Sequence, residues 1–219
     1  MGLANQGVTP GRTTLLEAVN ICLQNIGEQP VNSLEDPQIV EASTAERTIL
    51  EFHKEGQTRG WSWNSERGYE FLKDAGTSQI TVPTNLVSFA PDAYQWAGRF
   101  QLRGQRVYDK QERTYALGVE IPSLEADVVW LLPWDECPEA FNRWCTIRSA
   151  RVFSDRVLSS DAIFKYTALD EQMALTELQR VEIEQAQPNS LTGGPGLRPF
   201  PTFSPGLGLL GRSGGYLRG

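Results

Sequence analysis

Two tryptophans stand beside three carboxylates in the stretch from residue 130 to residue 139. The five residues are Trp130, Trp134, Asp135, Glu136 and Glu139. A glycosidase needs two carboxylates a set distance apart, and tryptophan rings beside them resemble a platform for a sugar. The other interpretation is structural, because acids in the first turn of a helix favour its positive end and the rings could pack a hinge. A glycan-binding or glycan-hydrolysing protein is therefore kept as the alternative function.

The sequence has one histidine, His53, and three cysteines, Cys22, Cys137 and Cys145. No two cysteines have the two-to-four-residue gap that is typical of a zinc site, and an odd, sparse count does not make a disulfide framework. We expect the cysteines to be small buried side chains and His53 to be a surface or core residue of a helix. The sequence also lacks a Gly-x-x-x-x-Gly-Lys-Ser/Thr phosphate loop. We expect no metal and no cofactor.

The chain of 219 residues has a formal net charge of -7 and a pI of about 4.9. A protein that grips DNA through its phosphates needs a basic face, so this charge argues against a free-standing nucleic-acid-binding module. No apolar run approaches the roughly 20 residues of a membrane helix, and residues 1–13 carry no apolar signal segment. We therefore expect neither a membrane anchor nor a secretory signal.

Two helices are expected in the first 60 residues. Thr14 and Glu17 form a capping-box pattern, which opens a helix that ends at Gly27. The second helix is expected over residues 36–59, because Asp36-Pro37 is an N-cap followed by proline at the first helical position. Gly60 would end this helix, as glycine commonly does.

Two more helices are expected after residue 137. The first of these begins at Pro138 and is apolar on two sides, which is typical of a helix buried between neighbours. Arg148 lies within its main apolar stripe and should therefore need a carboxylate partner or a route to solvent. The last helix is expected from Ser160-Asp161 to just before Pro188.

The hydrophobic period changes to two between these helical regions, over residues 66–132. Tyr69 and Phe71 alternate, and so do Ile80 and Val82, with a turn-like segment at residues 73–78 between them. This pattern predicts one hairpin. A second hairpin is expected around residues 103–106.

The stretch Gly60–Phe71 joins the two patterns and contains Trp61 and Trp63. In an extended segment both rings would lie on one face. We expect them to seat the helical part on the β part, and we assign Trp61, Trp63, Tyr69 and Trp144 to this structural junction. The alternatives are a pair of exposed rings that stack on a ligand and a subunit interface.

Residues 188–219 are rich in glycine and proline and cannot form a core of their own. Apolar residues are nevertheless spaced along the segment, which favours an arm that lies on a neighbouring subunit or partner; plain disorder is the alternative. The candidate contacts are Phe200, Phe203, Leu207, Leu209 and Tyr216.

The expected fold is α+β, a four-helix bundle of long helices with an inserted β-rich hairpin portion and an extended C-terminal arm. The chain is expected to begin with a flexible N-terminal arm (1–12), followed by the first half of the helical bundle (13–65). The β-rich portion (66–132) would come next, then the second half of the helical bundle (133–187) and the C-terminal arm (188–219).

Two stretches of the sequence resemble a known family. The first contains Ala18-Val19-Asn20, then Ile26-Gly27-Glu28-Gln29-Pro30-Val31-Asn32-Ser33-Leu34-Glu35, and ends in Arg59-Gly60-Trp61-Ser62-Trp63-Asn64. The second is Pro138-Glu139-Ala140-Phe141-Asn142-Arg143-Trp144, which leads through Ala150 and Phe153. Together and in this order they resemble tail tubular protein A, the head-to-tail adaptor of short-tailed phages (podoviruses), over roughly residues 14–187.

The resemblance implies a structural protein of the virion tail, in its neck, that assembles in the host cytoplasm. It implies a ring of this chain, a dodecamer, between the portal protein and a nozzle protein of the tail tubular protein B type. Genome DNA would pass through the lumen without specific binding. No catalytic residue is implied, and the chain is expected not to be an enzyme. The glycan alternative then becomes a virion-associated protein that acts on the host surface.

Overall fold

The computed structural model describes residues 11–35, 40–96, 98–157 and 166–186. The N-terminal arm, apart from residues 11 and 12, and the whole C-terminal arm lie outside the described residues. The candidate contacts Phe200, Phe203, Leu207, Leu209 and Tyr216 are among those not described.

Four helices of three turns or more are present where the sequence predicts helices. They are α1 (Leu15–Asn25), α2 (Val40–Gln57), α4 (Glu139–Val157) and α5 (Ala168–Ala186). The capping box at the start of α1 is confirmed, because the Thr14 side chain accepts a hydrogen bond from the Glu17 amide while Glu17 reaches back to the Thr14 amide. Gly60 has a φ of 72°, the left-handed conformation in which glycine commonly follows a helix.

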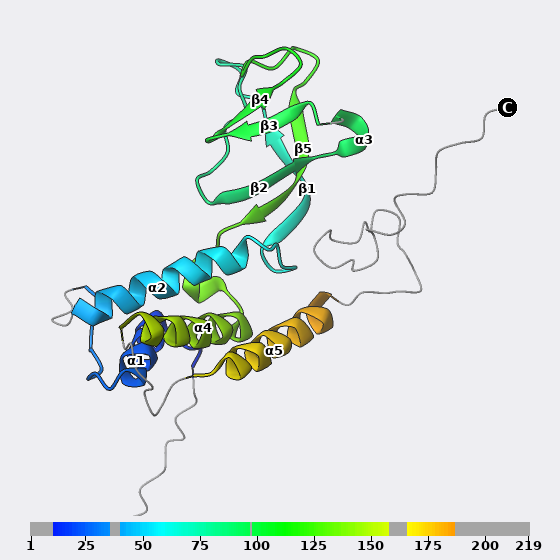
Figure 1. Ribbon diagram of the computed structural model, residues 1–219. Coiled ribbons are helices and arrows are strands. Elements are labelled where there is room, and N and C mark those ends of the chain that lie inside the picture. The colour runs from blue at the N-terminus through cyan, green and yellow to red at the C-terminus, as the bar shows by residue number, and fades with distance from the viewer. Residues whose placement is uncertain (1–10, 36–39, 97, 158–165, 187–219) are drawn as a thin grey trace, which may run out of the picture.

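The predicted four-helix bundle of long helices is wrong. In Figure 1, α4 is the central helix, and α1, α2 and α5 pack around it. The helix α1 is only 11 residues long, and α5 packs against α4 rather than closing a ring of four helices. The reason is the composition of α4, which has buried residues over most of its circumference, from Phe141 and Trp144 to Ala150 and Phe153. A helix that is buried over most of its circumference along its middle turns must be surrounded by its neighbours.

The β portion contains two antiparallel sheets between α2 and α4. Its elements are β1 (Ser65–Leu72), β2 (Leu86–Pro91), α3 (Ala93–Trp96), β3 (Phe100–Arg103), β4 (Arg106–Asp109) and β5 (Ser123–Trp130). The larger sheet has the order β1-β5-β2, and β3 pairs with β4. In Figure 1 this portion lies at one end of the molecule, beyond the C-terminal end of α2.

The structure corrects one of the two predicted hairpins. Tyr69 and Phe71 pair with Ala126 and Leu124 of β5, so they do not face Ile80 and Val82 across a local turn. The turn at residues 73–78 is present, but the backbone after it bonds to the smaller sheet, where the Val107 amide donates to the Ile80 carbonyl (3.1 Å). The hairpin at residues 103–106 is confirmed by the pairing of Arg103 with Arg106.

Two separate clusters of buried hydrophobic residues hold the described chain together. One is formed by the helices with Trp61 and Trp134, and the other by the β portion around Ile80, Val107 and Leu124. The chain therefore has to pass between the two clusters, and the residues at these passages decide how the parts are joined.

Candidate functional site

The chain passes twice between the two hydrophobic clusters, once after α2 and once before α4. Residues 53–64 make the first passage, and residues 130–141, which include the short helix η1 (Trp134–Glu136), make the second. We call these two segments together the junction. They lie side by side, and three buried polar side chains, His53, Gln57 and Asn64, are found there.

Trp61 and Trp63 lie in a turn, not in an extended segment. The Asn64 amide donates to the Trp61 carbonyl at 3.2 Å, and β1 begins only at Ser65. Both rings nevertheless reach the same partner, because their centroids lie 6.4 Å and 5.0 Å from that of Phe141. The Trp61 indole donates to the Gly56 carbonyl at 2.9 Å. The two rings thus anchor the turn to the first turn of α4.

Two buried amide side chains fasten the two passages together, and neither was predicted from the sequence. The side-chain amide of Asn64 donates to the carbonyls of Gln57 (3.0 Å) and Trp130 (2.8 Å). The Gln57 amide donates to the Leu132 carbonyl (3.0 Å), and its oxygen accepts from the Leu132 amide (2.7 Å). Buried polar groups that are fully paired rigidify a structure and specify one arrangement. In the sequence, only their position next to the two tryptophans could have pointed to these amide side chains.

Close backbone approach at two glycines brings the helices and the sheet together. A Cβ atom on Gly56 would lie 2.6 Å from Cζ3 of Trp144 and 2.9 Å from Cε2 of Phe141. A Cβ atom on Gly60 would lie 3.1 Å from the Val129 side chain, and its φ is positive. Neither position has room for a side chain without movement of its neighbours.

His53 and Cys137 form a buried pair inside the junction. His53 Nε2 lies 3.3 Å from Cys137 Sγ, and His53 Nδ1 lies 3.1 Å from the Gln57 amide nitrogen. Burial lowers the pKa of His53 to about 4 and raises the pKa of Cys137 to about 12. A nucleophilic cysteine needs the opposite shifts, toward thiolate and imidazolium. The pair is therefore neutral and structural, and His53 is a core residue.

The other two residues assigned to the junction lie in different places. Trp144 is buried on α4, with its ring centroid 5.9 Å from that of Phe141, and the Arg59 guanidinium lies 5.3 Å from the Trp144 ring. Tyr69 lies on β1, where its ring contacts Phe71 and Trp130. The structure thus brings Trp61, Trp63 and Trp144 around Phe141 and leaves Tyr69 in the β portion.

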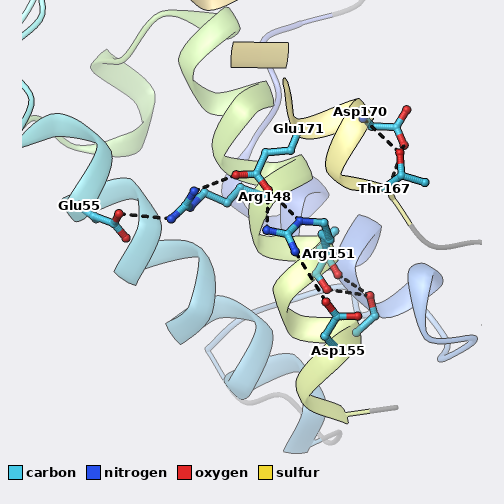
Figure 2. A network of polar contacts seen from close by, with 9 residues as sticks. Glu55, Arg148, Arg151, Asp155, Thr167, Asp170 and Glu171 are labelled. Carbon is cyan, nitrogen blue, oxygen red and sulfur yellow. Dashed lines mark hydrogen bonds and ion pairs between the residues drawn. The ribbon is translucent and has the colours of Figure 1, made fainter. Parts of the chain in front are cut away.

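A network of ion pairs holds α5 on α4, as Figure 2 shows. Arg148 donates to Glu171 of α5 at 2.8 Å and lies 3.3 Å from Glu55 of α2. Arg151 bonds the other oxygen of the Glu171 carboxylate at 2.7 Å. Of the two alternatives predicted for Arg148, a carboxylate partner or a route to solvent, the structure shows the carboxylate partner. At the other end of α5, Glu182 accepts from the Ser62 amide at 2.6 Å, which ties α5 to the junction as well.

The tryptophans and acids near residue 135 do not form one sugar-binding surface. Trp130 packs against the β cluster and Trp134 belongs to the helical cluster. Trp134 is buried, and its indole donates to the Thr13 carbonyl at 2.7 Å. The Glu139 carboxylate accepts from the Thr13 amide at 2.8 Å. These contacts secure the chain just before α1 and give the glycan alternative no support.

Within residues 11–35, 40–96, 98–157 and 166–186, no group of three or more histidine, cysteine, aspartate or glutamate side chains is placed to hold a metal ion. The helices of the described part are all too short or too polar to span a bilayer. The described contacts of the junction connect the two hydrophobic clusters through buried rings and hydrogen bonds.

Two comparisons with known proteins bear on the identity of the chain. A search of characterised proteins found no match. The sequence model of a family described as "Tail tubular protein" matches residues 16–188, which include the described helices, the β portion and the junction. The chain belongs to the tail tubular protein family, and it is a structural component of a phage tail.

Proposed function

We propose that this chain is the subunit of a head-to-tail adaptor. In this proposal twelve copies form a ring that joins the portal protein to a nozzle protein of the tail tubular protein B type. The ring extends the channel through which the genome leaves the capsid, and it acts without catalysis. It assembles in the host cytoplasm and becomes part of the virion neck.

The observation that carries the proposal is the set of hydrogen bonds that Gln57 and Asn64 make across the junction. An adaptor has to hold one partner at each end in a fixed orientation, so its two parts must not swing relative to one another. Domains joined by a small polar interface move by default. Here Gln57 and Asn64 bond the ends of β5 and α2 to each other, and Gly56 and Gly60 allow close approach. We propose that residues 13–65 with 133–187 act as one body and residues 66–132 as the other.

The charge of the chain fits a channel for DNA. A basic lumen would hold the genome by its phosphates, whereas this chain carries a net charge of -7. Genome DNA would pass such a lumen without specific binding. Residues 188–219 follow α5 directly, and we propose that their apolar residues make contacts with a neighbouring subunit, the portal or the nozzle.

The mass of the full-length protein in solution tests the proposal. Sedimentation is measured for the purified chain alone, with portal protein, and with an unrelated capsid protein as the control. We expect a species of about twelve chains. If the chain does not form this species alone, we expect it in the mixture with the portal protein and not in the mixture with the control protein. A chain that stays monomeric in all three mixtures would refute the adaptor proposal.

A further inference from the structure

The outer face of α5 is apolar although it faces solvent. Leu169, Met173 and Ile183 are 68%, 63% and 47% exposed. Their spacing places them in one stripe along the helix, opposite the side that carries the buried Leu178. An apolar stripe on a helix is normally buried against another element. No described part of the chain covers this one.

The charged residues on the same face are already paired with each other. Arg180 bonds both Glu177 and Glu184 within α5. Two carboxylates and one guanidinium leave this stretch with one negative charge in excess. The face is therefore an apolar stripe with an acidic end, which favours an apolar partner that carries basic residues.

The outer face of α2 has these properties. Val40 and Leu50 are 77% and 42% exposed. Arg47 and Lys54 lie on the same face, and neither takes part in an ion pair between described residues. Two of the four acids of α2 are neutralised, since Glu51 pairs with Arg156 and Glu55 pairs with Arg148. Glu41 and Glu46 lie toward the edges of this face, so its exposed centre keeps the two basic side chains.

The two faces lie on different sides of the helical part. In Figure 1, α4 lies between α2 and α5 and packs against both. Two different faces that fit each other make a head-to-tail interface, and such an interface generates a ring when its rotation closes. We propose that the outer face of α5 in one copy docks on the outer face of α2 in the next copy. This inference rests on the proposed ring and identifies the surfaces that would form it.

Cross-linking through single cysteines tests the pairing. The three natural cysteines are buried, so a short bismaleimide should join only cysteines that are introduced on the surface. We expect the full-length double variant Leu50→Cys/Met173→Cys to give a ladder of covalent oligomers. A mixture of the two single variants should give covalent dimers only. Each single variant alone should stay monomeric on a denaturing gel, because the two faces differ.

Surface charge provides a second test. We expect the pair Leu169→Asp and Met173→Asp, made together, to abolish the ring species seen in sedimentation. Val119 is 94% exposed and lies in the β portion, so Val119→Asp is the matched control and should leave the ring intact. Circular dichroism of both proteins verifies that they are folded.

The outcomes separate this inference from the adaptor proposal. A wild-type chain that forms rings while the double cysteine variant gives no ladder would overturn the α5–α2 pairing alone. Dimers from either single variant would overturn it too, since they require identical faces to meet. If Met173→Cys reacts with maleimide only after residues 188–219 are deleted, and no ladder forms, the C-terminal arm covers the face and the pairing is wrong. A wild-type chain that stays monomeric with and without portal protein would defeat both proposals.

Discussion

Mild acid should weaken the junction through His53, the one histidine in the sequence. Its folded pKa is lowered by burial to about 4, from an ordinary value of 6.5. Between these two values the unfolded chain binds a proton that the folded chain does not, so stability rises with pH in this window. The contribution of His53 is therefore complete above about pH 6.5 and is lost as the pH falls toward 4. By linkage, the loss between pH 7.5 and pH 5.0 amounts to about 2 kcal/mol.

The assay is urea unfolding at pH 5.0, 6.0, 6.5 and 7.5, at one protein concentration, since the apparent stability of an oligomer depends on concentration. Carboxylates also titrate near pH 5, so the wild type is compared with His53→Gln. We expect the difference in unfolding free energy between the two proteins to shrink by about 2 kcal/mol from pH 7.5 to pH 5.0. A difference that is constant over this range would refute the argument that His53 is held neutral by burial. If the variant does not fold, a flat wild-type profile from pH 5.5 to 7.5 would refute it equally.

Three substitutions and one deletion test the rest of the junction and the arm. Gly56→Ala removes a helical glycine, which by itself should stabilise the protein by about 1 kcal/mol. The new Cβ would lie 2.6 Å from Trp144, however, and overpacking should cost about 1–3 kcal/mol, so we expect a net loss of stability. A higher urea midpoint than that of the wild type would contradict the close approach. Trp61→Phe loses the hydrogen bond from the indole to the Gly56 carbonyl, whereas the indole nitrogen of Trp63 bonds no described residue. Trp61→Phe should therefore lower the free energy of unfolding by about 1 kcal/mol more than Trp63→Phe does. Equal urea midpoints for the two variants would contradict this. Deletion of residues 188–219 should weaken binding to the portal or nozzle in a pull-down while circular dichroism stays unchanged, and undiminished binding of both partners would exclude the arm.

Much of the helical part could be predicted from local signals. The capping box at Thr14 and the glycine at position 60 act within one turn of the chain, so they can be seen in the sequence. The need of Arg148 for a carboxylate partner could also be predicted, because an arginine in an apolar stripe is costly unless it is paired. Which carboxylate would meet it could not, since Glu171 and Glu55 lie on two other helices.

The errors arose where distant residues compete with near ones. Phe71 alternates with Tyr69 as in a local hairpin, but β5 offers a longer apolar partner strand some 50 residues later. The bundle prediction assumed four equivalent helices, whereas α4 has buried residues over most of its circumference and takes the centre. Gln57 and Asn64 could not be identified because an amide side chain is usually exposed. Only the fold shows that both are enclosed.

The contact between α1 and α4 has a consequence for synthesis on the ribosome. Asn25 donates to the Ala150 carbonyl at 3.1 Å and to the Ser154 hydroxyl at 2.8 Å. The first helix therefore cannot make these contacts until more than a hundred later residues have been synthesised. At about 5–20 residues per second this interval lasts roughly 6–25 seconds. The β portion is continuous in sequence and can close before α4 is made. We expect the nascent chain to fold from its middle, with the apolar sides of α1 and α2 uncovered until α4 emerges between them.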